Sequence, residues 1–245
     1  ASIHSESISE APLIGYIPNY DTQIYYGGAD ALTSSKPHSD TTFLTDILNE
    51  SNGVKVESLP ISGSRPSRNE YYSAVSNGDA LFSTGGFDHS GGGQGDNKIY
   101  KLAKKTIAEG ETWKWETLNI GKDSDGKEPP QRYQDGLAFV PELNKLFMVG
   151  GLTREVTEEG IDWIGKNDIW SVDLNNTELV WRKEGDFFEI FRGSSPYEDL
   201  GSSYQKFQFG QISENDFFAS TDRIKRTQAV WNGGLQKVMI MVPET

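Results

Sequence analysis

Three stretches of the chain share one pattern of apolar and polar positions: two apolar runs, a short polar turn between them, and a closing pair of glycines. The clearest is FVPELNKLFMVGG, in which residues 141–144 separate the runs and Gly150 and Gly151 end the second run. Proline and asparagine favour turns, and glycine adopts backbone angles that other residues reach only at a cost. The pattern predicts a β-hairpin.

The same layout occurs without gaps at two earlier places, YIPNYDTQIYYGG (residues 16–28) and AVSNGDALFSTGG (residues 74–86). Each hairpin is followed by a polar loop and then by two more strand-like segments joined by a turn. These segments are residues 41–48 and 54–61, residues 96–102 and 112–118, and residues 167–174 and 178–184. The sequence therefore predicts units of four strands, whose glycine pairs lie 58 and then 65 positions apart.

A strand that ends in Gly-Gly, an aromatic residue in the next strand after Asn-Asp or Asp-Asn, and a tryptophan in the fourth strand together resemble the kelch repeat of β-propellers. The tryptophans are Trp115 and Trp181, whereas the first unit has VKV at residues 54–56 in that place. The resemblance covers about residues 13–184. It implies an all-β fold, a kelch-type β-propeller of four-stranded antiparallel blades.

The repeat divides the chain unevenly. We expect an N-terminal extension over residues 1–12 and the propeller over residues 13–245, with whole blades near residues 13–61, 68–118 and 132–184. Residues 226–245 predict the first half of a fourth blade, and residues 186–225 are either an insertion between blades, which is favoured, or a degenerate blade. Because propellers carry about four to eight blades, we expect truncation, cleavage or a second chain to account for the incomplete ring. If residues 186–225 hide a blade, the ring is small instead.

The expected blades also predict how the sheets pack. Radially stacked sheets bury both faces of their inner strands, which explains unbroken apolar runs such as residues 146–149. We expect the tryptophans of the outer strands to wedge between adjacent blades. We expect the glycine pair to lie where the chain passes close to the central channel and no side chain fits.

Composition supports the all-β prediction and excludes several classes of function. The 26 glycines, 10 prolines and 11% aromatic residues fit many short strands joined by tight turns. With 36 acidic against 23 basic residues, the net charge of −13 works against binding a nucleic acid. The absence of cysteine excludes disulfides, thiol catalysis and cysteine-metal sites.

The sequence leaves the cellular compartment open. No apolar run approaches the roughly 20 residues that span a bilayer, so we expect no membrane span in this chain. The opening residues ASIHSESISE lack the basic and apolar regions of a signal peptide, and a start at Ala fits signal removal and an engineered end equally. A secreted or cell-surface location is slightly favoured over a cytoplasmic one. The sequons at Asn49 and Asn175 add little, because chance produces such triplets.

Loop lengths single out one face of the expected propeller. In up-and-down blades the second-to-third loops and the blade connections share a face. The second-to-third loops (residues 29–40, 87–95 and 152–166) are longer than the first-to-second turns (residues 18–21, 76–79 and 141–144). Because binding residues concentrate on long loops of rigid scaffolds, we place a ligand surface on this long-loop face. The candidate binding residues are Arg154, Glu158, Glu159, Asp162 and Trp163 in the third loop, with Tyr197 and Tyr204 from residues 186–225.

The sequence offers no catalytic motif, and we expect neither a cofactor nor a bound metal. Asp88, His89 and Asp96 lie in or beside a glycine-rich loop without the spacing of metal ligands, so a solvated loop is favoured. The run DSDG at residues 123–126 begins like a calcium loop but lacks the remaining ligands, and we interpret it as a blade connection. Copper-radical oxidases of the galactose-oxidase type resemble kelch propellers but need a cysteine cross-linked to tyrosine, and this chain has no cysteine.

Three functions remain open from the sequence. The favoured one is a non-enzymatic kelch scaffold that binds a protein or peptide partner through the long-loop face. Trp163 is a hypothesised contact residue, although a cap folded back on its blade is the favoured interpretation of that side chain. The alternative is a carbohydrate-binding or carbohydrate-active extracellular propeller that uses exposed aromatic and acidic residues. A purely architectural role is the third, in which residues 238–242 pair with a second chain that completes the propeller.

Overall fold

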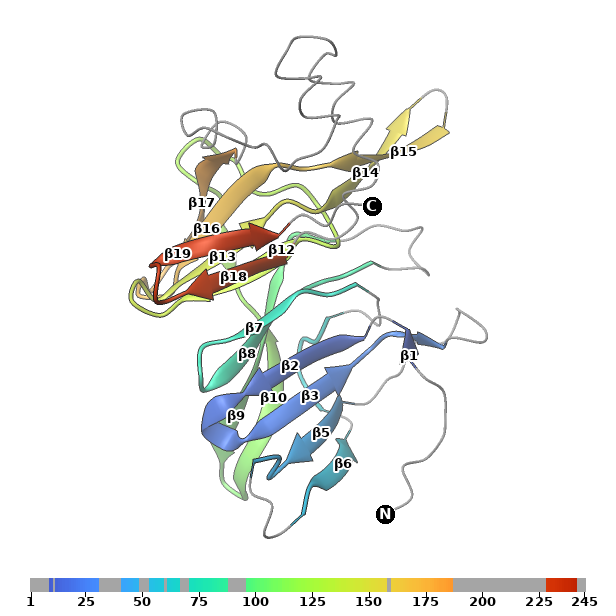
Figure 1. Ribbon diagram of the computed structural model, residues 1–245, viewed down its shortest axis with the longest axis vertical. Coiled ribbons are helices and arrows are strands. Elements are labelled where there is room, and N and C mark those ends of the chain that lie inside the picture. Colours follow the sequence, from blue (N-terminus) through green and yellow to red (C-terminus); the bar gives the residue numbers. More distant parts are fainter. Residues whose placement is uncertain are drawn as a thin grey trace. The chain divides into compact units, whose positions relative to one another are not determined.

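The computed structural model describes residues 9–10, 12–30, 41–48, 53–59, 61–66, 71–87, 96–157, 160–186 and 228–241. These residues form β-strands and one short 3-10 helix, Pro18–Tyr20. The chain divides into two compact units, Ala1–Asn119 (unit 1) and Ile120–Thr245 (unit 2), and each has its own sheets (Figure 1). No helix in this described part is long and apolar enough to cross a membrane.

Unit 1 contains two four-stranded antiparallel sheets whose strands lie side by side in chain order. The first sheet consists of β2 (Leu13–Ile17), β3 (Thr22–Tyr26), β5 (Thr41–Thr45) and β6 (Lys55–Leu59). The second sheet consists of β7 (Ala74–Ser76), β8 (Ala80–Thr84), β9 (Ile99–Ile107) and β10 (Gly110–Thr117). The short strands β1 (Ser9–Glu10) and β4 (Ala29–Asp30) pair with each other.

Unit 2 contains the third sheet and two separate hairpins. The third sheet has the antiparallel order β12 (Gly136–Val140), β13 (Lys145–Val149), β16 (Asp168–Asp173) and β17 (Leu179–Asp186), and β11 (Ile120–Gly121) runs parallel to β17 at its edge. The hairpins are β14 (Leu152–Thr157) with β15 (Gly160–Gly165), and β18 (Gln228–Asn232) with β19 (Lys237–Met241).

The predicted fold class is confirmed. The described residues form an all-β fold with four-stranded antiparallel sheets of the kind that make propeller blades, and the hairpin β18–β19 lies where a partial blade is expected. Residues 187–225, which hold most of the expected insertion or degenerate blade, lie outside the described residues, as does most of the extension at residues 1–12.

The connection that precedes a sheet also extends that sheet, which the sequence did not indicate. Gly63 forms a parallel bridge with Trp115 of β10, where the Trp115 backbone N–H donates to the Ser62 carbonyl at 3.2 Å. In unit 2, β11 pairs in parallel with Leu179 and Val180 of β17. The second and third sheets therefore both gain a parallel edge segment next to their outer strand.

The turn of the second hairpin differs from the predicted one. In the third sheet Val140 pairs with Lys145 across a four-residue turn, and the first sheet has the same layout. In the second sheet Ser76 pairs with Leu81, and the Asn77 N–H donates to the Ala80 carbonyl at 3.2 Å. The expected four-residue turn at residues 76–79 is therefore wrong: the turn is a two-residue one centred on residues 78–79. Because Gly78 has φ +103°, it supplies the positive angle that such a turn requires.

The first and second sheets share one apolar core. Their first strands, β2 and β7, lie side by side, and Gly15 of β2 lies against Leu81 of β8, so that a Cβ at Gly15 would displace the Leu81 side chain. The Trp115 side chain of β10 is fully buried, its ring centroid lies 5.6 Å from that of Tyr26, and its Nε1 donates to Thr41 Oγ1 at 3.4 Å. The predicted wedge of an outer-strand tryptophan between two sheets is confirmed for Trp115.

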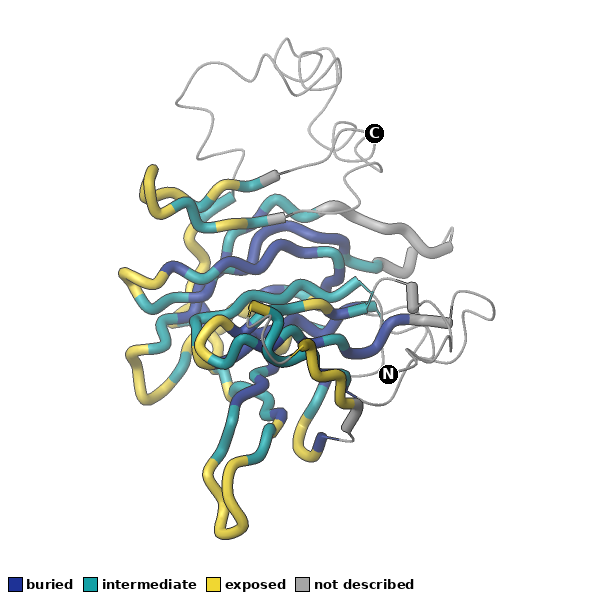
Figure 2. The backbone as a smooth tube through the Cα atoms, turned by 60° about the horizontal axis from the view of Figure 1, so that its bottom comes forward, coloured by how far each residue is buried: buried dark blue, intermediate teal, exposed yellow. Residues whose placement is uncertain are grey.

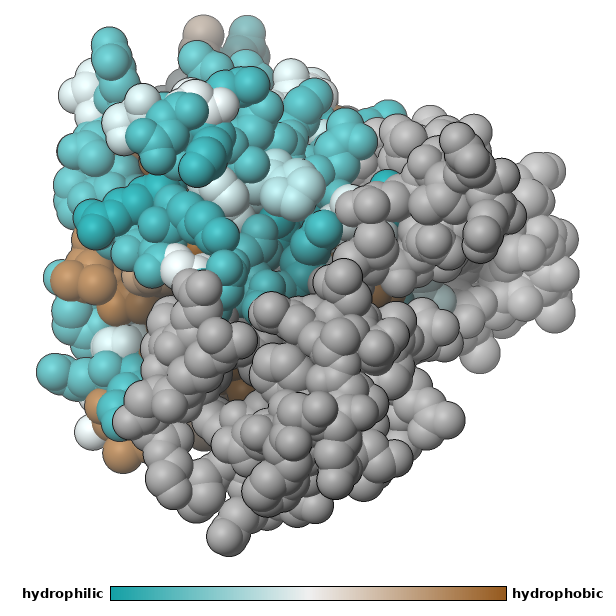
Figure 3. All heavy atoms as spheres, turned by 90° about the horizontal axis from the view of Figure 1, so that it is seen from above, coloured by the Kyte–Doolittle hydropathy of each residue, from teal (hydrophilic) through white to brown (hydrophobic). Residues whose placement is uncertain are grey.

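The third sheet has a similar apolar interior. Its buried side chains include Leu146, Met148, Val172 and Trp181, and Trp181 lies on the outer strand β17 as Trp115 lies on β10. The hairpin strand β18 packs beside β12, the first strand of this sheet. Figure 2 shows the buried positions in dark blue along the strands and the exposed positions in yellow at the turns. In Figure 3 the coloured, described surface is mostly hydrophilic, as the net charge of −13 leads one to expect.

The glycine pair has a local explanation in each unit. Gly27 has φ +67° and lies against the ring of Tyr72. Gly151 has φ +96°, and a Cβ there would lie 2.8 Å from the Tyr133 carbonyl oxygen and 3.0 Å from Asp135 Cα. Positive φ combined with a close neighbouring segment therefore requires glycine at these positions.

Candidate functional site

The third long loop, which carries most of the candidate binding residues, is not a loop. Residues 152–157 and 160–165 form the antiparallel hairpin β14–β15, called the arm below, which projects beyond the strands of the third sheet (Figure 1). Its register places Arg154 opposite Trp163 and Glu155 opposite Asp162. The prediction of irregular structure at residues 152–166 is thus corrected to a strand pair with a defined ladder.

Backbone hydrogen bonds tie the base of the arm to the segment that leads into β12. Leu152 and Tyr133 exchange two hydrogen bonds, with N···O distances of 3.1 and 2.9 Å. The Lys166 N–H donates to the Gly151 carbonyl at 2.8 Å, and Thr153 Oγ1 donates to the Gln131 carbonyl at 3.1 Å. The arm therefore leaves the sheet from a base that is anchored on two sides.

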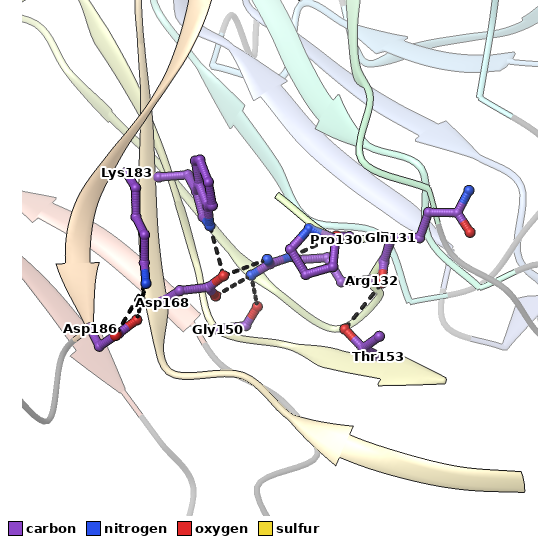
Figure 4. A network of polar contacts seen from close by, with 9 residues as sticks. Pro130, Gln131, Arg132, Gly150, Thr153, Asp168, Lys183 and Asp186 are labelled. Atoms are coloured by element: carbon purple, nitrogen blue, oxygen red, sulfur yellow. Dashed lines mark hydrogen bonds and ion pairs between the residues drawn. The ribbon is translucent and has the colours of Figure 1, made fainter. Parts of the chain in front are cut away.

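A buried ion pair lies beneath this base. The Arg132 side chain is fully buried, and its guanidinium donates to both carboxylate oxygens of Asp168, at 2.6 and 2.8 Å (Figure 4). The same guanidinium donates to the carbonyls of Gly150 at 2.8 Å and Pro130 at 3.2 Å. Trp170 Nε1 donates to Asp168 Oδ2 at 2.7 Å. Arg132, Asp168 and Trp170, called the Arg132 brace below, thus join the segment before β12, the end of β13 and the start of β16.

The electrostatics of the Arg132 brace favour an ionised carboxylate. Burial raises the pKa of Asp168, but hydrogen bonds from Arg132, the charge of Arg132 and the hydrogen bond from Trp170 outweigh burial and hold that pKa below its ordinary value. Bidentate pairing of a guanidinium with a carboxylate fixes geometry as well as charge. The Arg132 brace is therefore a positioning element for the base of the arm.

The second sheet has a related pair of a carboxylate and an aromatic residue. Tyr100 Oη donates to Asp96 Oδ2 at 2.6 Å, and the Lys98 N–H donates to Asp96 Oδ1 at 3.0 Å. Burial raises the pKa of Asp96 despite these hydrogen bonds. Burial and the adjacent carboxylate also raise the pKa of Tyr100. In both sheets a carboxylate near the start of the third strand accepts a hydrogen bond from that strand's aromatic residue.

The structure shows no metal site within the residues it describes. No three side chains of the kinds that ligate metals gather there, while Asp88 and His89 lie outside the described residues. In the calcium-like run, Asp123 Oδ1 accepts from the N–H groups of Asp125 at 2.9 Å and Lys127 at 2.7 Å. This run is a hydrogen-bonded turn, as its interpretation as a connection requires.

The predicted site residues are only partly placed. Arg154, Asp162 and Trp163 lie on the two strands of the arm, whereas Glu158, Glu159, Tyr197 and Tyr204 lie outside the described residues. Sequence reasoning missed Arg132 and Asp168, because charged residues are almost never fully buried unless paired. The Asn-Asp step before an aromatic residue, Asn167-Asp168, was the available signal.

Comparisons with known proteins identify no family. No family model matches the chain, and no curated protein matches it. Among solved structures it is similar to YjhT, with 12% identical residues, 76% of this chain and 68% of that chain covered, and a TM-score of 0.34. The fold described above rests on the strand order and register of this chain.

Proposed function

We propose that this protein is a non-enzymatic scaffold, a kelch-type β-propeller that binds a protein or peptide partner through its long-loop face. The observation that carries the proposal is the arm, a strand pair that projects from the third sheet and is anchored at its base. The three hairpins that end in Gly-Gly and the buried outer-strand tryptophans support the kelch-type assignment.

The two ends of the third sheet differ in a way that favours the arm as the contact surface. At one end the turn at residues 141–144 is closed by its own hydrogen bonds, and Asn144 and Asn175 hydrogen-bond each other at 3.0 Å across neighbouring turns. At the other end the chain extends into the arm. Binding residues on rigid scaffolds concentrate on projecting segments of this kind.

The charged groups at the base of the arm support a binding role rather than a catalytic one. Arg132 is fully buried, and its partner Asp168 is 8% exposed, so neither is presented to a substrate. Their hydrogen bonds are directed to each other, to Trp170 and to backbone carbonyls. The Arg132 brace supports the arm, and the partner would contact the arm itself.

The test is affinity capture from a cell extract followed by measurement of Kd for the captured protein. We expect Trp163→Ala to weaken binding by about tenfold or more, as truncation of an interface tryptophan commonly does. The matched control is Leu143→Ala, because Leu143 is 51% exposed on the turn at the opposite end of the third sheet. Equal Kd values for both variants would contradict the proposal. A glycan array supplies the opposing outcome: sugar binding that is lost in Trp163→Ala would favour the carbohydrate alternative.

A further inference from the structure

The ladder of the arm shows which backbone groups point away from it. Antiparallel strands alternate between pairs that exchange hydrogen bonds and pairs whose N–H and C=O groups point outward. The Lys166 N–H donates to the Gly151 carbonyl inside the ladder. Leu152, the residue after Gly151, bonds outward to Tyr133 instead. These bonds fix the alternation along both strands. On β15 the outward groups are those of Ile161, Trp163 and Gly165.

Within the described residues, this edge of β15 lacks the usual protection. Natural proteins commonly block exposed strand edges with proline, lysine, bulges or a covering segment. None of the three outward residues is proline or lysine, and none of the described strands pairs with β15 on that side. An isolated two-stranded ribbon is also only marginally stable in water, and a third strand adds stability.

The register of the arm also places two acidic residues at opposite positions, which a basic residue on a third strand would complement. Glu155 and Asp162 lie directly opposite each other in the register, and like charges at opposite positions are destabilising. A basic residue opposite Asp162 on an added strand would share the face of both acidic residues and be of opposite charge to them. Residues opposite Ile161 and Trp163 would lie on the other face, next to apolar residues.

We propose that the edge of β15 binds an extended segment of a protein partner as an added β-strand, and that this segment alternates basic and apolar residues. The inference rests on the proposed function and names the partner's chemistry. Main-chain hydrogen bonds supply the affinity in this binding mode, and alternate side chains supply the specificity. The net charge of −13 favours encounter with a basic segment.

The test is amide hydrogen exchange of the full chain with and without a blocked peptide of alternating lysine and valine, matched in length to β15. We expect the peptide to slow exchange at Ile161, Trp163 and Gly165, whose N–H groups point outward. Asp162 and Ile164 already donate inside the ladder, so their exchange should change less. A peptide of alternating glutamate and valine should protect none of these amides.

Charge variants test the electrostatic part. Asp162→Lys should weaken binding of the lysine peptide by about tenfold, because it places like charges on neighbouring strands. A tenfold change in Kd corresponds to about 1.4 kcal/mol. Asp162→Asn, a smaller change, should cause an intermediate loss. The matched control is Glu142→Lys, which makes the same change of net charge at an exposed site on the turn at residues 141–144. This control should leave binding unchanged.

Several outcomes would overturn the inference. The first is that the peptide does not slow exchange at the outward amides of β15. The second is that the glutamate peptide binds as tightly as the lysine peptide. The third is that Glu142→Lys weakens binding as much as Asp162→Lys, which would indicate unspecific attraction by net charge. If the lysine peptide fails while partner capture still depends on Trp163, strand addition is wrong and the proposed function stands. If capture is independent of Trp163, the proposed function itself fails.

Discussion

Removing the carboxylate of Asp168 should destabilise unit 2 and loosen the base of the arm. Asp168→Asn keeps the size of the side chain but leaves the fully buried Arg132 guanidinium without a counter-charge. The carboxylate accepts three hydrogen bonds, two from Arg132 and one from Trp170. In either orientation of the amide, its NH2 group meets at least one of these donors. The variant therefore combines an unpaired buried charge with at least one lost hydrogen bond.

The expected magnitude follows from these contacts. Breaking a buried ion pair by removing one partner costs roughly 3–5 kcal/mol, and a hydrogen bond to a charged group is worth about 1.5–3 kcal/mol. We therefore expect Asp168→Asn to lower the free energy of unfolding of unit 2 by about 3 kcal/mol or more. Arg132→Met should have a similar effect, because it leaves the Asp168 carboxyl group buried without its counter-charge. The double variant should cost less than the sum of the two, by about 1–3 kcal/mol.

The assay is urea unfolding followed by hydrogen exchange in peptides of β12, β13 and β16, so that unit 2 is measured separately from unit 1. Exchange at Gly150 and Leu152 without denaturant reports on the base of the arm. A loss below about 1 kcal/mol in Asp168→Asn, or additive single effects, would show that Arg132 and Asp168 do not act as a pair.

Four further predictions concern single residues. Asp96→Asn should keep or raise the stability of unit 1 at neutral pH. The pKa of Asp96 is raised in the folded state, so the stability of the unchanged protein falls as the pH rises through that pKa. Urea unfolding at several pH values checks this. For Asp168 the pH dependence of stability has the opposite sign, because its pKa is lowered in the folded state. It contributes stability above about pH 4, and this contribution is lost as the pH falls through the folded-state pKa. Asp168→Asn lacks this contribution at every pH, so unit 2 should unfold in acid at a higher pH in the variant. Trp115→Ala should cost unit 1 roughly 3–5 kcal/mol in urea unfolding by opening a cavity between its two sheets. Gly151→Ala should lower the melting temperature of unit 2, because Gly151 has φ +96° and an added Cβ would lie 2.8 Å from the Tyr133 carbonyl oxygen. An unchanged Tm would refute this close approach.

The sheets were predictable from the sequence because their signals are local and repeated. Apolar runs such as residues 146–149 are short and bounded by turn residues and a glycine pair, which favours a strand over a buried helix. The burial of Trp115 was also predictable, since a large aromatic residue at the same place in two repeats indicates a shared packing role. The first sheet forms although residues 54–56 lack the tryptophan, so its strands do not depend on that residue.

The arm and the turn of the second sheet were harder to predict for different reasons. In the arm, four acidic residues and Gly160 suggested a loop, while Val156, Ile161, Trp163 and Ile164 held a weaker strand signal. In the second sheet, the gapless alignment concealed a change of register. Gly78, at the first central position before Asp79, favours a two-residue turn, and this local preference prevails over the four-residue layout of the other hairpins.

The Arg132 brace was not predictable because its partners meet only in the folded chain. Arg132 and Asp168 lie 36 positions apart, and each is a residue type that usually faces water. Their pairing becomes favourable because the segment before β12 and the start of β16 both pass the end of β13. A sequence pattern records neither this proximity nor the exclusion of water.

The separation between the Arg132 brace and the edge of β15 makes stability and binding distinguishable. Asp162 lies on the arm and is not part of the brace, so its substitution should change peptide affinity while the exchange of Gly150 and Leu152 stays the same. Asp168→Asn acts on the base of the arm directly, and it affects peptide binding at the edge of β15 only through that base. If Asp168→Asn weakens peptide binding while unit 2 remains folded, the orientation of the arm contributes to affinity. If peptide binding is unchanged although the base of the arm is loosened, the edge of β15 binds the peptide independently of the Arg132 brace.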